Sequence, residues 1–164
     1  MRYNSYAGHA FRATAVCLVV ALGSPALAQE AAPATPAAEP ALARTADDPQ
    51  LEWGPCPPFM PAGCAIAVLH GDPARDNLDV FFKVPGKSAI PAHWHTSPER
   101  MILVAGELQV TYEGQPMVTL RPGMYAYGPA RRPHDGACTS ADDCILFIAF
   151  ESPLDAIPVE APSD

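Results

Sequence analysis

His93-Trp94-His95-Thr96-Ser97-Pro98-Glu99 is the stretch that decides how this chain folds, and His134 follows it about forty residues later. Side chains in a strand alternate between faces, so His93 and His95 point the same way if the stretch is extended. A short kink after His95 lets Glu99 begin a new, strongly β segment. Three imidazoles and a carboxylate can bind one divalent metal ion. Because no thiolate joins the set, Fe, Mn, Zn, Ni or Cu is expected rather than an iron–sulfur cluster or a structural zinc.

The spacing around these residues resembles the two sequence motifs of the cupin family, over most of residues 62–150. The first motif is a Gly, an HxH pair, a Glu and a Gly, and the second is a Gly, a Pro and a His. The resemblance implies an all-β, single-domain cupin-type β-barrel, or jelly roll, of antiparallel strands. It also implies that four residues are the ligands of one metal ion: His93, His95, Glu99 and His134.

Three positions depart from the family pattern. Gly86 lies one residue further upstream of the HxH pair than usual, which lengthens a turn. Arg131 stands where the second motif normally has Gly, so this turn is expected to be of a different type. Cys138 replaces the common terminal Asn and removes an amide that would lie close to the ligands.

Many short apolar runs separated by Gly and Pro predict an antiparallel sandwich or barrel, independently of the resemblance. No helical period is found before Pro153 and no internal repeat is present. The predicted strands are residues 65–69, 78–84, 92–95, 99–105, 107–112, 117–120, 124–127 and 144–150.

The first residues read as an export signal rather than as part of the domain. Arg2 and Arg12 precede an apolar run at residues 13–22, which is too short to span a bilayer. Small residues before Ala28 predict cleavage there, and an uncleaved N-terminal anchor is the alternative. We therefore predict four segments: a signal peptide (1–28), an Ala/Pro-rich linker (29–50), a cupin β-barrel domain (51–158) and a C-terminal tail (159–164).

Charge restricts the partners. Eighteen acidic residues face ten basic ones, and the acidic excess is scattered along the chain. Nucleic acid, or a membrane after signal removal, is therefore not expected as a partner. We expect a small-molecule substrate or ligand in a periplasmic or secreted protein.

Four cysteines remain after the predicted cleavage: Cys56, Cys64, Cys138 and Cys144. An even number in an exported protein suggests disulfides, and four cysteines allow three pairings. Local pairing, Cys56 with Cys64 and Cys138 with Cys144, is favoured. A free Cys138 near the metal is the competing hypothesis, although a free thiol is readily lost in an oxidising compartment.

Strand parity predicts which side chains line the interior. If Glu99 points inward, Met101 and Leu103 do too, while Ile102 and Val104 face outward. These outward aliphatic residues need cover from a second sheet, an end segment or another subunit, and a homodimer would supply it.

Glu99, Tyr125 and Tyr127 are the candidate catalytic residues. Glu99 can act as a general base if it leaves the metal, as the resemblance permits. The two tyrosines lie two positions apart on one face and can offer a hydroxyl to a substrate, although packing explains most aromatic residues in a small barrel. Arg131 and Arg132 either hold an anionic substrate or lie in solvent.

The ligand set favours a metal-dependent oxidoreductase of the dioxygenase type acting on a small organic substrate. No further His, Asp or Glu is placed as a dedicated acid or base, which suits reactions carried mainly by metal and dioxygen. A metal-dependent isomerase, decarboxylase or lyase is one alternative. A non-catalytic module that binds a small ligand or a metal is the other.

Overall fold

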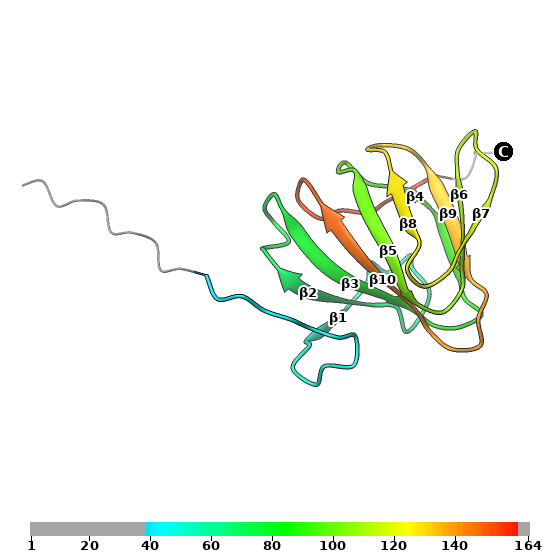
Figure 1. Cartoon of the computed structure of the whole chain (residues 1–164). Coiled ribbons are helices and arrows are strands. Elements are labelled where there is room, and N and C mark those ends of the chain that lie inside the picture. The colour runs from blue at the N-terminus through cyan, green and yellow to red at the C-terminus, as the bar shows by residue number, and fades with distance from the viewer. Residues whose placement is uncertain (1–38, 161–164) are drawn as a thin grey trace, which may run out of the picture. The chain divides into compact units, whose positions relative to one another are not determined.

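The computed structural model describes residues 39–160, and this part of the chain contains strands and no helix (Figure 1). The predicted all-β fold of antiparallel strands is confirmed. Eleven strands follow one another: β1 (Trp53–Pro55), β2 (Ala65–His70), β3 (Leu78–Val84), β4 (Ala89–Trp94), β5 (Glu99–Ala105), β6 (Leu108–Tyr112), β7 (Val118–Leu120), β8 (Tyr125–Gly128), β9 (His134–Cys138), β10 (Cys144–Phe150) and β11 (Ile157–Pro158).

The predicted signal peptide lies outside the described residues. The linker prediction overlaps them only at residues 39–50, which hold neither helix nor strand. The boundaries of the four segments stay predictions. No helix long and apolar enough to cross a membrane occurs between residues 39 and 160.

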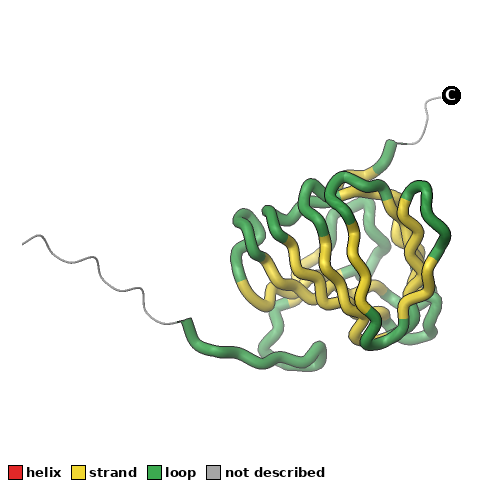
Figure 2. The backbone as a smooth tube through the Cα atoms, turned by 45° about the horizontal axis from the view of Figure 1, so that its top comes forward, coloured by secondary structure: helices red, strands yellow, loops and turns green. Residues whose placement is uncertain are grey.

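The strands form two antiparallel sheets that pack as a jelly roll without closing into a continuous barrel (Figure 2). The six-stranded sheet has the order β1-β2-β3-β10-β5-β8, and the five-stranded sheet has the order β11-β4-β9-β6-β7. From β3 onward the chain passes repeatedly between them. The segment between β4 and β5 makes one such crossing, so it carries the chain from His95 in one layer to Glu99 in the other.

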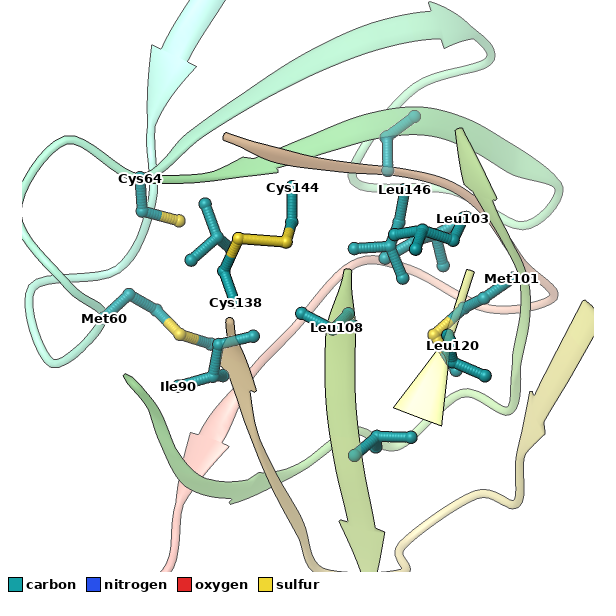
Figure 3. Packing of buried hydrophobic residues seen from close by; sticks show 14 of the residues in the cluster. Met60, Cys64, Ile90, Met101, Leu103, Leu108, Leu120, Cys138, Cys144 and Leu146 are labelled. Carbon is teal, nitrogen blue, oxygen red and sulfur yellow. A yellow bond between two sulfur atoms is a disulfide. The ribbon is translucent and has the colours of Figure 1, made fainter. Parts of the chain in front are cut away.

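The core lies between the two sheets. Strand β10 alternates strictly between buried and half-buried side chains, as expected for period-two geometry. Its Leu146 pairs with Leu103 of β5, and Figure 3 shows these two side chains together. Full burial of each contributes roughly 1.5–3 kcal/mol relative to exposure. The predicted parity of β5 is correct, since Met101 and Leu103 are buried while Ile102 is 40% exposed.

Val104 is also 40% exposed on the outer face of β5. The homodimer expected to cover this face stays a prediction.

Both local disulfides are present, as favoured from the sequence. Cys56 pairs with Cys64 and Cys138 with Cys144, each with Cα atoms less than 6 Å apart. The second disulfide is drawn in Figure 3 within the buried cluster. A free Cys138 is thereby excluded, and two disulfides are consistent with an oxidising compartment.

Three strands were not predicted, namely β1, β9 and β11, and β4 differs from the prediction in its bounds. Strand β9 was not predicted because its sequence, His-Asp-Gly-Ala-Cys, is polar and small. It forms because β4 and β6 hydrogen-bond to it on both sides. Strand β4 begins three residues earlier than predicted and contains Pro91, which lacks an N–H. An irregularity in the pairing between Ile90 and His93 accommodates that proline.

The loop between β8 and β9 contains a residue in an unusual backbone conformation. Arg131, at the motif position that normally has Gly, adopts a φ of 60°. Its backbone N–H donates a hydrogen bond of 2.7 Å to the carbonyl of His95. A side chain in this left-handed region costs about 1–2 kcal/mol. The loop is therefore held against the candidate ligand residues at a local cost.

We predict that Arg131→Gly stabilises the protein. Relief of the left-handed strain outweighs the greater flexibility of glycine in the unfolded chain, for a net gain of about 0.5–1 kcal/mol. Urea unfolding of the wild type and the variant measures this. Arg132→Gly is the matched control, because its backbone is not left-handed and the change should destabilise by a similar amount. A loss of stability in Arg131→Gly contradicts the strain argument.

Candidate metal centre

The sheet registers place the candidate ligands in two facing rows. In the five-stranded sheet, His93 of β4 pairs with His134 of β9, which pairs with Tyr112 of β6. In the six-stranded sheet, Glu99 of β5 pairs with Gly128 of β8. Paired residues in adjacent antiparallel strands project from the same face. The two rows therefore meet in the interior of the sandwich.

The structure brings all four predicted ligand residues together. One potential ligand atom from each of His93, His95 and His134 lies within 4.8 Å of the others. One carboxylate oxygen of Glu99, Oε1, lies 3.3 Å from Nε2 of His95, and the other, Oε2, lies 3.6 Å from Nε2 of His134. His93, His95 and Glu99 are each at most 7% exposed. The group is thus compact and almost fully removed from solvent.

Backbone carbonyls orient each imidazole through its other nitrogen. Nδ1 of His93 is 2.7 Å from the carbonyl of Pro91, and Nδ1 of His134 is 3.1 Å from that of Arg132. Nδ1 of His95 is hydrogen-bonded to the carbonyl of Asp155. Because a carbonyl only accepts, we assign the proton of each ring to Nδ1. A neutral ring then presents an unprotonated Nε2, the arrangement usual for histidine ligands of metals.

Burial keeps two of these rings neutral. It lowers the pKa of His93 to about 3, and the neighbouring His134 and His95 add to this effect, while the hydrogen bond to Pro91 opposes it. Burial also lowers the pKa of His134, against the opposing charge of Glu99. Neutral imidazole is the form that binds a metal ion.

The donor set fits a divalent cation. Nε2 of His95 and Nε2 of His134 face the two carboxylate oxygens of Glu99, at 3.3 and 3.6 Å. A cation among these atoms would have nitrogen and oxygen donors directed at it from several sides. Nitrogen and oxygen donors of this kind suit the first-row metals named above and do not distinguish among them.

The C-terminal segment supports the site from outside. The Asp155 carboxylate accepts hydrogen bonds from the Thr96 backbone N–H at 2.9 Å and from the Thr96 hydroxyl at 2.7 Å. The Ser97 hydroxyl oxygen accepts the backbone N–H groups of residues 151 and 152. These contacts tie the turn after His95 to residues 151–155. Sequence reasoning missed Asp155, because no spacing rule links it to residues nearly sixty positions away.

A cavity of about 360 Å³ extends from the ligand cluster into the sandwich. Its walls are largely aliphatic and aromatic, including Met101, Leu108, Leu146, Ile148 and Phe150. The volume is within the range of small-molecule sites. The cavity therefore pairs one polar end, formed by the four candidate ligands, with an apolar body.

Tyr112 lies at the polar end, although it is not among the catalytic residues predicted from the sequence. It is 7% exposed, and its ring centroid is 5.0 Å from that of His134. Burial, and secondarily the charge of Glu99, raises the pKa of its phenol above the ordinary value. Its alternation with Val110 and Leu108 along one strand face would have indicated an inward direction. The pairing with His134 was not visible without β9.

Tyr125 and Tyr127 do not lie at the cavity, which corrects the expectation that they offer hydroxyls to a substrate there. They are 58% and 52% exposed and lie outside the cavity lining. The reason is register: Tyr125 pairs with Ile102 and Tyr127 with Arg100, both of which face outward. Ala126 and Gly128 are the residues of β8 on the inner face. Arg131 and Arg132 also lie outside the cavity lining.

Comparisons with known proteins agree with the fold. A family model described as the cupin domain matches residues 80–150. No curated protein matches the sequence. Among solved structures, an RmlC-like cupin protein from Ralstonia eutropha JMP134 has a TM-score of 0.57 at 20% identity, covering 72% of this chain and 73% of its own.

Two further structural neighbours have names that state an activity. The polyketide cyclase RemF from Streptomyces resistomycificus has a TM-score of 0.60 at 14% identity, with 75% of this chain and 89% of its own covered. The DMSP lyase DddQ from Ruegeria pomeroyi DSS-3 has a TM-score of 0.56 at 22% identity, with 66% and 60% covered. This chain covers less than two thirds of the length of the DMSP lyases that it matches. At these identities the likeness establishes the fold.

We predict that the metal-free protein loses stability as the pH falls below about 6.5. The unfolded chain binds a proton at His93 near pH 6.5, whereas the folded chain binds it only near pH 3. Between these values the unfolded state holds more protons, so lower pH favours unfolding, by up to about 1.4 kcal/mol per pH unit. His134 adds in the same direction. Stability at pH 5 should therefore be about 2 kcal/mol below that at pH 7.

Urea unfolding of metal-free protein across this range provides the measurement. His93→Gln should reduce the slope of stability against pH, because the group whose pKa is lowered is removed. Equal stability of the wild type at pH 5 and pH 7 contradicts the prediction.

Proposed function

Because this chain belongs to the cupin superfamily, we propose that it is an exported, metal-dependent enzyme acting on a small organic substrate by a dioxygenase-type oxidation. One observation carries the proposal: three imidazoles oriented through Nδ1 converge with a buried carboxylate in the lining of a largely apolar cavity. Burying these four polar groups is costly and would be difficult to explain for packing alone.

His93, His95, His134 and Glu99 would hold the metal, which, when bound, would supply Lewis acidity and, if redox-active, reactivity toward dioxygen. The carbonyls of Pro91, Arg132 and Asp155 hold the rings in a fixed orientation, so little reorganisation accompanies binding. The apolar walls exclude water from the reacting end of the substrate.

The distribution of carboxylates supports oxidation over acid–base chemistry. Among the Asp and Glu residues between positions 39 and 160, Glu99 is the one that is buried. The Asp155 carboxylate already accepts two hydrogen bonds from Thr96, and Asp135 is exposed at the rim. A reaction in which metal and dioxygen do most of the work makes few demands on protein acids and bases.

A non-redox lyase, isomerase or decarboxylase is the second candidate. Glu99 supports it, since its Oε2 atom projects toward the space beside Gly128 and could remove a proton from a substrate. The name of the neighbouring DMSP lyase is compatible with such chemistry. A non-catalytic binding module is the remaining alternative, and it would use the same cavity without turnover.

We predict one equivalent of bound divalent metal per chain in the wild type and at least a hundred-fold weaker binding in His93→Ala. Loss of one ligand from a buried set of four removes a nitrogen donor and leaves the coordination of the cation incomplete. Elemental analysis and competition with a chelator measure stoichiometry and affinity. His70→Ala should bind like the wild type, since His70 lies outside the cavity lining. A wild type that retains no stoichiometric metal after reloading refutes the proposal.

The reaction type is tested with protein loaded separately with each candidate metal. We expect oxygen uptake with phenols, enediols or β-diketones in the Fe(II) form, abolished by His93→Ala. Turnover that continues without oxygen supports the lyase-type candidate instead. Metal binding without turnover of any compound supports the binding module.

The same proposal includes export of the protein from the cytoplasm. The two disulfides support a periplasmic or secreted location, because such bonds persist in oxidising compartments. N-terminal sequencing of the protein from its native compartment tests cleavage after Ala28.

A further inference from the structure

The phenol oxygen of Tyr112 is a buried polar atom that lacks a hydrogen-bond partner. Among side-chain nitrogens and oxygens of residues 39–160, it alone is both buried and unpaired. A buried hydroxyl without a partner costs about 1–3 kcal/mol. Phenylalanine would pack in the same space without that cost. The hydroxyl therefore needs an explanation from something other than folding.

Its position suggests the explanation. A Cβ built on Gly128 would lie 2.5 Å from the Tyr112 oxygen and 2.8 Å from Oε2 of Glu99. Both oxygens thus border one small space beside the glycine. Any larger residue at position 128 would displace one of them. The hydroxyl is consequently placed next to a candidate metal ligand, within the cavity lining.

The lining of the rest of the cavity indicates what kind of molecule would fit there. Away from the histidines and Glu99, aliphatic and aromatic side chains such as Leu146 and Ile148 form the walls. A ligand that matches this lining has an apolar body and one polar head at the cluster. A phenol is protonated at neutral pH and donates, so the matching head group contains an oxygen acceptor.

We propose that Tyr112 is a substrate-positioning residue, whose hydroxyl donates a hydrogen bond to a carboxylate or enolate oxygen on a small, otherwise apolar molecule bound at the histidine cluster. This inference rests on the proposed function, because the cation at the cluster offsets the charge of the head group beside Glu99. The hydrogen bond compensates the unpaired hydroxyl only when the ligand is bound. Tyr112 thereby selects oxygen-bearing head groups over apolar ones.

The test uses the full mature chain loaded with Zn(II), and sodium hexanoate as the probe. Calorimetric titration should give hexanoate binding that is at least ten-fold weaker in Tyr112→Phe than in the wild type, since hydrogen bonds to charged groups are among the stronger ones. Zinc content should remain one equivalent in both. Tyr125→Phe is the matched control, because its hydroxyl is on the outer face, and it should bind hexanoate like the wild type.

A second readout separates positioning from a structural role. Without hexanoate, Tyr112→Phe should have a Tm equal to or above that of the wild type, because the unpaired hydroxyl is removed. A lower Tm overturns the proposal, since it would mean that the hydroxyl stabilises the fold. Unchanged hexanoate affinity in a fully zinc-loaded variant, or no hexanoate binding by the zinc-loaded wild type, also overturns it and leaves the metal site standing. Failure of the wild type to hold zinc refutes the proposed function itself.

Discussion

The hydrogen bond from each imidazole Nδ1 to a backbone carbonyl is the constraint on which the candidate site depends. It determines the tautomer, and the tautomer determines that Nε2 is free at the centre of the cluster. The donating rings of His93 and His134 each bond a carbonyl two residues earlier in their own chain segment. Local backbone geometry therefore orients both rings before any tertiary contact is considered. His95 is different, because its carbonyl partner belongs to Asp155 at the far end of the domain.

That difference explains why the C-terminal segment matters to the site. Residues 151–156 do not add a long strand to either sheet, yet they bond to the turn between β4 and β5 at Thr96 and Ser97. This turn carries the chain between the two layers, with His95 on one side of the crossing and Glu99 on the other. A segment that fixes the turn fixes the separation of these two ligands. The last residues of the domain thus act on its most buried polar cluster.

The extent to which the sequence predicts the molecule follows from the range of each interaction. Alternation within β5 correctly placed Met101 inside and Ile102 outside, because parity is a property of one strand. The HxH pair could be interpreted in the same way, because alternation along an extended segment puts both histidines on one face. Glu99 then follows at the start of the next strand. Tyr125 was misplaced because its direction depends on pairing with Ile102 across strands. The role of Tyr112 depends on β9, whose small polar residues form a strand only between two neighbours.

Polar groups in the interior carry a free-energy cost that the remainder of the domain must offset. The candidate site buries three imidazoles, a carboxylate and an unpaired phenol where aliphatic residues would be more stable. Arg131 adds backbone strain in the loop that bonds to His95. A core of tightly packed Leu and Val and two disulfides stabilise the same small domain. Unfavourable terms concentrated in and around one group of side chains are the pattern expected where selection has acted on binding rather than on stability.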